Sequence, residues 1–503
     1  MADSTPDFIV VGAGSAGCAV AAGLVEREAG SVTIIESGPS DSGMLVRMPF
    51  GLVWLMHGRR DWRFSSTAQT GLDGRQLRIP RGRMLGGSAS INSMVWFRGR
   101  RDDFDNWNVP GWTWADVEAD FEAVEARMQP ARLTSPHPLS ESFQQLFGGN
   151  GIAPPTPEYE SAGVFHFNMD NGRRRSPADA FLRPAQARGL NVVTGRTVDR
   201  LRIKGDRAVA VVFDDGSEMK ASKGIVLSAG AIGSPAILLK SGIGPADDLK
   251  RAGTGLILDD PGVGANLHDH PAAGIHFAGP GSGYGIALAQ VPQWLGAPLR
   301  YRASGTGPLG SPTVEAGAFF NARMDGGPPD IQVHFIPFML GWKGRRFVLG
   351  SGYFADVCVC RPKSRGRLAL QPSGIAIDLG IFSDSRDLDL LVEGWRRLRS
   401  IMAEASLGGR RAPEAYPGAK VGDDTESISA HIRRVAATAY HPVGTLAMGT
   451  HDTPVTPGLR YRALDGLWVA EASIMPAVTS ANTNAPSIMI GHRAAAIIAA
   501  DAS

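Results

Sequence analysis

A glycine-rich turn between two short apolar runs determines how this chain begins to fold. Residues 8–12 read FIVVG, residues 15–28 (SAGCAVAAGLVERE) follow with helical periodicity, and residues 32–36 (VTIIE) form a second apolar run. A strand, a glycine turn, a helix and a second strand make up a βαβ unit. Such units build parallel sheets that helices cover on both faces, so the sequence predicts an α/β fold.

The spacing of the glycines in this turn indicates a dinucleotide site. Gly12, Gly14 and Gly17 form a G-x-G-x-x-G pattern, and Glu36 ends the second apolar run. Gly12 permits the tight turn, Gly14 lets the backbone approach a pyrophosphate, and Gly17 lets the helix pack on the strand. The helix N-terminus binds phosphate, and an acid about 20 residues further on binds ribose hydroxyls. The pattern does not separate NAD from FAD, and a glycine-rich turn without a ligand is the alternative reading.

The composition excludes several other classes of protein. The net charge is +2, which gives no case for a nucleic-acid partner. The three cysteines, Cys18, Cys358 and Cys360, form no C-x-x-C pair and exclude a disulfide scaffold. The first residues lack the pattern of a signal peptide, and no apolar run reaches the roughly 18 residues of a membrane span. We therefore expect a cytoplasmic protein without a membrane span.

Four further motifs identify a family. They are RGRMLGGSASINSMVWFRG at 81–99, AGAIGSPAILLKSGIGP at 229–245, HPVGTLAMG at 441–449 and GLWVAEASIMPAVTSANTNAPSIMIG at 466–491. Together with the N-terminal turn, and in this order, they resemble the glucose–methanol–choline (GMC) oxidoreductase family. The resemblance extends from about residue 7 to residue 499 and implies FAD as the cofactor.

The resemblance also implies two domains. A Rossmann-like FAD-binding domain is expected to assemble from the separated segments 1–155, 189–271 and 436–503. A substrate-binding domain, with an antiparallel sheet covered by helices, is expected from 156–188 and 272–435.

The family's motifs assign residues to the cofactor. The first turn contributes Gly12, Gly14, Ser15, Ala16, Gly17, Glu36 and Ser37. The motif at 81–99 contributes Arg83, Leu85, Gly86, Gly87, Ser88, Asn92, Ser93, Met94 and Val95. The remaining positions are Val198, Ala229, Gly230, Glu471, Ala472, Asn484, Ala485 and Pro486. Glu471 replaces the family's usual Asp, and Ile91 stands where some relatives carry the His that attaches FAD covalently, so we expect non-covalent FAD.

Two residues are expected to carry the chemistry. His441, in H-P-V-G-T, matches the family's general base, and an imidazole that titrates near neutrality suits removal of a hydroxyl proton. Asn484 matches the second member of the catalytic pair, which is His or Asn in the family, and an amide orients the substrate oxygen by hydrogen bonding. A helix N-cap is the structural alternative for Asn484.

Two polar segments are read as structural. His268-Asp269-His270 has the spacing of metal ligands, but the family has a similar segment without a metal, so we expect no metal. Arg173-Arg174-Arg175 is expected in a solvated loop.

The expected function is oxidation of a primary alcohol to the aldehyde. The partners are then a small-molecule alcohol and an acceptor that reoxidises the flavin, either dioxygen or a quinone. A choline-type dehydrogenase and a non-redox lyase on the same fold are the alternatives. The region 272–345 is expected to line the substrate cavity, and its aromatic residues would suit a ring-bearing alcohol. They are Tyr284, Trp294, Tyr301, Phe319, Phe335, Phe338 and Trp342.

Overall fold

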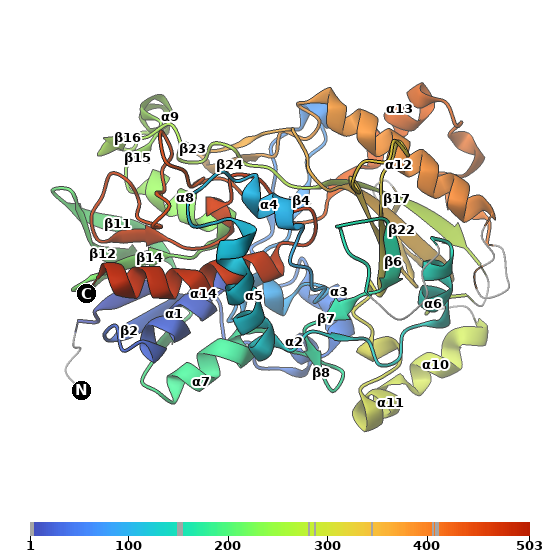
Figure 1. The fold of residues 1–503 in the computed structure, drawn as a ribbon, viewed down its shortest axis with the longest axis horizontal. Coiled ribbons are helices and arrows are strands. Elements are labelled where there is room, and N and C mark those ends of the chain that lie inside the picture. Colours follow the sequence, from blue (N-terminus) through green and yellow to red (C-terminus); the bar gives the residue numbers. More distant parts are fainter. Residues whose placement is uncertain are drawn as a thin grey trace.

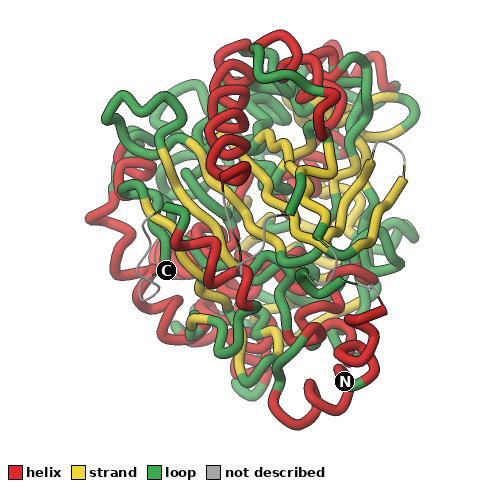
Figure 2. The backbone as a smooth tube through the Cα atoms, turned by 90° about the vertical axis from the view of Figure 1, so that its right-hand side faces the viewer, coloured by secondary structure: helices red, strands yellow, loops and turns green. Residues whose placement is uncertain are grey.

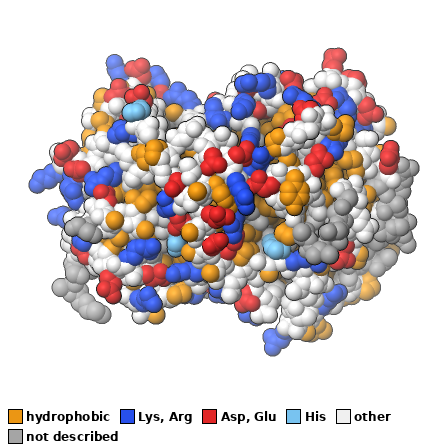
Figure 3. All heavy atoms as spheres, in the orientation of Figure 1, with side chains coloured by type: hydrophobic (Ala, Val, Ile, Leu, Met, Phe, Trp, Pro, Cys, Tyr) orange, Lys and Arg blue, Asp and Glu red, His pale blue; other side chains and the backbone are white. Residues whose placement is uncertain are grey.

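The structure is a computed structural model of the 503-residue chain. It describes residues 5–147, 154–279, 282–285, 288–343, 346–404, 407 and 412–502. None of the helices in these ranges is long and apolar enough to cross a membrane. Charged side chains of both signs are scattered over the face shown in Figure 3, in keeping with the net charge of +2.

A five-stranded parallel sheet forms the first half of the molecule, and its strand order is β10-β2-β1-β14-β27. The strands come from distant parts of the chain: β1 (Phe8–Val11), β2 (Val32–Glu36), β10 (Asn191–Thr194), β14 (Gly224–Leu227) and β27 (Leu467–Val469). The central strands β1, β2 and β14 are wholly buried and, apart from Thr33 and Glu36 of β2, carry no polar side chain, as expected for a sheet that is covered on both faces. The α/β fold predicted from the first turn is confirmed.

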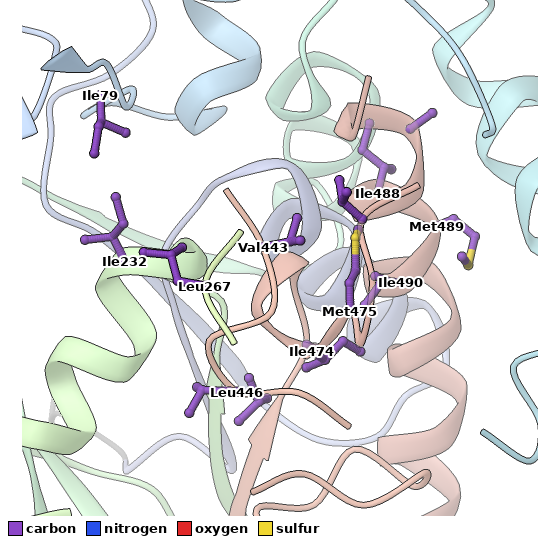
Figure 4. Close-up of a cluster of buried hydrophobic side chains, with 14 of the residues drawn as sticks. Ile79, Ile232, Leu267, Val443, Leu446, Ile474, Met475, Ile488, Met489 and Ile490 are labelled. Carbon is purple, nitrogen blue, oxygen red and sulfur yellow. The ribbon is translucent and has the colours of Figure 1, made fainter. Parts of the chain in front are cut away.

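Two helices that lie at opposite ends of the chain pack side by side on this sheet. Figure 1 shows α14 (Asn484–Asp501, red) beside α1 (Ser15–Glu26, blue). The contact is close because it passes through glycine: a Cβ atom on Gly491 would lie 2.3 Å from the backbone oxygen of Ala16. Val443, from a loop, and Ile474, from the short 3-10 helix Ala472–Ile474, join Ile488 of α14 in the buried cluster of Figure 4. The two helix N-termini are therefore held next to each other.

A seven-stranded antiparallel sheet forms the second half. Its main path is β25-β17-β22-β19-β18-β6, and β26 also pairs with β17. The strands are β6 (Ser161–Val164), β17 (Pro271–Ala278), β18 (Ala316–Phe320), β19 (Ile331–Ile336), β22 (Gly352–Val359), β25 (Glu414–Tyr416) and β26 (Ala437–Thr438). The helices α12 (Ser385–Glu404) and α13 (Thr425–Val435) lie against this sheet, at the upper right of Figure 1 and across the yellow strands of Figure 2. The sheet and its helices agree with the implied substrate domain, whereas the domain limits themselves stay a prediction.

A third, smaller antiparallel sheet lies in sequence between β10 and β14 of the parallel sheet. It consists of β11 (Val198–Lys204), β12 (Arg207–Phe213) and β13 (Glu218–Lys220), and α8 (Gly230–Lys240) packs against β11.

Candidate active site

One large cavity, of about 940 Å³, extends from the glycine-rich turn to the antiparallel sheet. At one end it is lined by the carboxyl ends of β1 and β2 and by the N-termini of α1 and α14. At the other end it is lined by one face of β17, β19 and β22 and by the loop that carries His441. A ligand in this cavity can contact both halves of the molecule at once.

In the turn after β1, glycines let backbone segments lie close to one another and leave backbone open to the cavity. Gly12 has φ +98°, and a Cβ atom there would lie 2.5 Å from the backbone oxygen of Ser228. A Cβ atom on Gly17 would lie 1.9 Å from the backbone oxygen of Gly12, so helix and strand touch at this point. Apart from its neighbours along the chain, no described residue has an atom within 4 Å of the position that a Cβ of Gly14 would take, and Gly14 lines the cavity. Glu36 supports the turn, since its two carboxylate oxygens accept the N–H groups of Ala13 (3.1 Å) and Gly38 (2.9 Å).

Unpartnered buried polar atoms at this end of the cavity fit a flavin nucleotide. Neither carboxylate oxygen of Glu471 meets a hydrogen-bond partner among the described residues, and the same holds for Nδ2 of Asn484. Burial is the main cause that raises the pKa of Glu471 to about 7, and Ser234, Ser473 and Gly230 lie near enough to offset part of this rise. Buried polar groups are normally satisfied, so these atoms indicate a polar ligand with hydroxyl and carbonyl groups. The two helix N-termini add favourable sites for negative charge.

Most residues assigned to the cofactor line this cavity. They are Gly12, Gly14, Ser15, Ala16, Glu36, Ser37, Gly87, Ser88, Asn92, Ser93, Met94, Val95, Val198, Ala229, Gly230, Glu471, Ala472 and Asn484. The others are not among its lining residues: Gly17, Arg83, Leu85, Gly86, Ala485 and Pro486. Gly86, for example, donates its N–H to the Ala13 oxygen at 2.8 Å and so ties the second motif to the first.

Arg174 is buried, which corrects the expectation of a solvated arginine loop. Its guanidinium donates to the backbone oxygens of Val46 (3.1 Å) and Ala89 (2.9 Å) and to Oδ1 of Asn92 (2.8 Å). Burial lowers the pKa of Arg174 to about 9. Because Arg174 occupies Oδ1 of Asn92, it sets which end of that amide faces the cavity.

A continuous chain of hydrogen bonds crosses the other end of the cavity. The Nδ1 atoms of His441 and His270 are 3.1 Å apart, and Nε2 of His270 lies 3.1 Å from the Thr479 oxygen. On the other side of the His441 imidazole, Nε2 lies 3.1 Å from Nδ2 of Asn482. Oδ1 of Asn482 in turn accepts a hydrogen bond from Nε2 of Gln332 at 3.1 Å. Burial is the main cause that lowers the pKa of His270 to about 4 and that of His441 well below its usual range. Both imidazoles are therefore neutral at ordinary pH.

The segment His268-Asp269-His270 holds His441 in place. The backbones of His268 and Val443 exchange two hydrogen bonds, and Nε2 of His268 accepts the N–H of Val478 at 2.9 Å. Oδ1 of Asp269 accepts the backbone N–H of His441 at 2.9 Å, and the side chain of His270 meets the imidazole itself. Among the described residues no group of three His, Cys, Asp or Glu side chains is placed to hold a metal ion.

The asparagine beside His441 is Asn482, whereas the sequence analysis assigned Asn484. Asn484 is the first residue of α14, and its Oδ1 accepts a bond from Ser15 Oγ of α1 at 2.8 Å. Asn482 precedes the helix, where the loop can point its amide at His441. Ser480 fixes this loop, because its N–H and its hydroxyl both donate to Asp103, at 2.7 and 2.6 Å.

Six of the seven aromatic residues named for the substrate end do not line the cavity. Tyr284, Trp294 and Phe338 pack with Phe50 in a separate cluster. None of Tyr301, Phe319 and Phe335 is in the cavity wall either, and the side chain of Trp342 lies outside the described residues. The rings that line the cavity are those of Trp62, Phe64, Phe354, Tyr416 and Tyr440.

This combination of a discontinuous dinucleotide-binding half, a sheet-walled substrate half and a buried imidazole at their junction defines a flavin-dependent oxidoreductase. Two models, both described as GMC oxidoreductase, match residues 6–272 and 362–491. The chain belongs to the GMC oxidoreductase family and is an FAD-dependent enzyme acting on alcohols.

Relatives cover nearly the whole chain. An alcohol dehydrogenase [acceptor] of Pseudomonas putida is 34% identical over 98% of this chain and 95% of its own. An oxygen-dependent choline dehydrogenase of Rhizobium johnstonii is 34% identical, covering 97% of this chain and 94% of its own. Among solved structures, pyridoxine 4-oxidase from Mesorbium loti is 29% identical with a TM-score of 0.85, covering 97% of this chain and 98% of that one.

Proposed function

We propose that the protein oxidises a primary alcohol to the aldehyde, with His441 as the general base and Asn482 as the group that orients the hydroxyl oxygen. The observation that carries the proposal is the directed hydrogen-bond chain from Thr479 to Gln332. Bound FAD supplies the hydride acceptor, and the cavity end formed by the N-termini of α1 and α14 would hold it.

The hydrogen-bond chain determines which nitrogen of His441 can take a proton. The Thr479 oxygen can only accept, so Nε2 of neutral His270 carries the hydrogen and its Nδ1 is an acceptor. Nδ1 of His441 must then donate to His270, which leaves the lone pair on Nε2 of His441. That lone pair faces the cavity end of Asn482, and so the base is set in its reactive tautomer before substrate arrives.

Asn482 is oriented in the same way. The amide of Gln332 donates to Oδ1 of Asn482, so Nδ2 of Asn482 points at Nε2 of His441. A substrate hydroxyl can replace Asn482 as the donor to the lone pair of Nε2 of His441, and its oxygen can then accept from the freed N–H of Asn482. Asn482 thereby stabilises negative charge on the oxygen while His441 removes the proton.

The experiment that tests this function is anaerobic mixing of the FAD-loaded protein with a panel of primary alcohols. The expected result is loss of the oxidised-flavin absorbance together with formation of the aldehyde. Admission of dioxygen, or of a quinone in its absence, then identifies the acceptor. Flavin that stays oxidised with every alcohol would exclude the proposal and favour the lyase alternative.

A further inference from the structure

Asp356 is a carboxylate in the substrate end of the cavity. It lies on β22, next but one to Phe354, and both residues line the cavity. Across the sheet it pairs with Gly274 of β17 and with His334 of β19, which line the cavity too. Directly opposed residues point to the same face of a sheet, so Asp356 stands in the middle of the wall that faces the reacting groups.

The carboxylate of Asp356 has no hydrogen bond or ion pair among the described residues. The other carboxylates of the cavity wall differ. Glu36 accepts two backbone N–H groups, Asp199 pairs with Lys240 at 2.9 Å, and Glu471 lies at the cofactor end beside Gly230. Asp356 is thus the single carboxylate that the substrate half presents to the cavity within the described part of the chain.

The surroundings of Asp356 suit a positive charge. Burial raises the pKa of Asp356 to about 7, and no cation in the described part of the chain lowers it. Aromatic side chains share this part of the wall: Phe354, Tyr416 and Tyr440. Ring faces attract organic cations, and a buried carboxylate is stable in its ionised form only when it is paired.

We propose that Asp356 binds a cationic group of the alcohol, an ammonium or a similar organic cation, while the hydroxyl lies at His441. The proposal rests on the proposed function for the hydroxyl end and adds a subsite for the other end. His334, one strand away from Asp356, lies close enough to His441 to contribute to its lowered pKa. Adjacent strands are about 4.8 Å apart, so one small molecule can reach from Asp356 past His334 to His441.

The test compares two alcohols of the same shape with the FAD-loaded protein. They are 4-(aminomethyl)benzyl alcohol, which is cationic, and 4-ethylbenzyl alcohol, which is neutral. Anaerobic flavin reduction gives the saturating concentration for each, and calorimetry gives the binding of benzylammonium chloride, which has no hydroxyl to react. The cationic alcohol is expected to saturate at a concentration roughly 10- to 100-fold lower than the neutral one, the usual contribution of a bond to a charged group.

Asp356→Asn should abolish most of this preference and the binding of benzylammonium, with the neutral alcohol changed less than about threefold. Asp356→Glu keeps the charge and should keep the preference for the cationic alcohol. This variant tests the subsite even if Asp356→Asn fails to fold. Glu404→Gln, which removes an exposed carboxylate from α12, is the control for net charge.

Two results would overturn the subsite: equal saturation by the two alcohols, or equal weakening of both in Asp356→Asn. Failure of the proposed function has a different signature. Neither alcohol would then reduce the flavin, while benzylammonium would still bind in an Asp356-dependent way.

Discussion

The Nδ1 atoms of His270 and His441 face each other at 3.1 Å, and only one of the two can carry a hydrogen. The backbone oxygen of Thr479 decides which one, since it accepts from the opposite nitrogen of His270. His270, which directly precedes β17, therefore sets the tautomer of His441, the proposed base. His270 acts through His441 and is a positioning residue.

Replacing His270 should slow flavin reduction without removing FAD. In His270→Leu the imidazole of His441 loses the acceptor that orients it, and we expect a loss of roughly 10- to 100-fold, typical of a displaced catalytic group. In His270→Asn the amide oxygen can still accept from Nδ1 of His441, so this variant should keep more of the rate. Rates and FAD content are measured on the same preparations, and equal rates in the two variants would contradict a positioning role.

Replacing Asn482 and replacing Asn484 should have different effects on flavin reduction and on FAD retention. Asn482→Ala removes the donor to the substrate oxygen and should lower the reduction rate by about 10²-fold or more, with FAD retained. Asn484→Ala removes an amide that bonds Ser15 and faces the cofactor end, so it should weaken FAD retention more than the chemistry. Stopped-flow reduction and the FAD-to-protein ratio test both. The reverse pattern would return Asn484 to the catalytic pair.

The sequence predicted those elements whose pattern is local. The βαβ unit lies where the periodicity of residues 8–36 places it. It missed β17 and β18, because their residues PAAGIHFA and AGAFF are almost entirely buried and show no alternation of polar and apolar residues. It also missed α6 (Pro138–Gln145), within a stretch whose prolines, serines and glycines favour a loop.

The same limit applies to the site. His441 could be found from its motif, but Asn482 and Asn484 are two positions apart in one motif, and only the start of α14 tells which one faces the base. Gln332 and Asp356 belong to no motif. They enter the site because β19 and β22 lie side by side in a sheet whose register the sequence does not show.

FAD should be released intact when the protein is denatured. Ile91 stands where some relatives carry the attachment histidine, and it is buried with an apolar side chain in the cavity wall. Acid precipitation should leave a yellow supernatant. A yellow pellet would show a covalent bond to another residue.

The buried histidines should make the protein sensitive to acid. Burial lowers the pKa of His334 to about 4, whereas an unfolded histidine titrates near 6.5. The folded state then binds fewer protons than the unfolded state between about pH 6.5 and 4, so the stability that is present above this window is lost as the pH falls through it.

His334→Gln should remove this contribution. The slope of the unfolding free energy against pH should fall by up to about 1.4 kcal/mol per pH unit within that window. Urea unfolding at several pH values measures the slope in both proteins. Parallel curves would mean that His334 is not held neutral by the fold.

If Nε2 of His441 takes the hydroxyl proton, the rate of anaerobic flavin reduction should depend on the protonation state of this imidazole, so the decisive measurement is that rate against pH. Because the pKa of His441 is lowered well below its usual range, the unmodified protein should reduce its flavin at a constant rate from about pH 6.5 upward and lose rate only in acid. His441→Ala should be slower by roughly 10²–10⁴ across this range while it keeps its FAD. A His441→Ala protein that is loaded with FAD and reduced at nearly the normal rate would contradict the account.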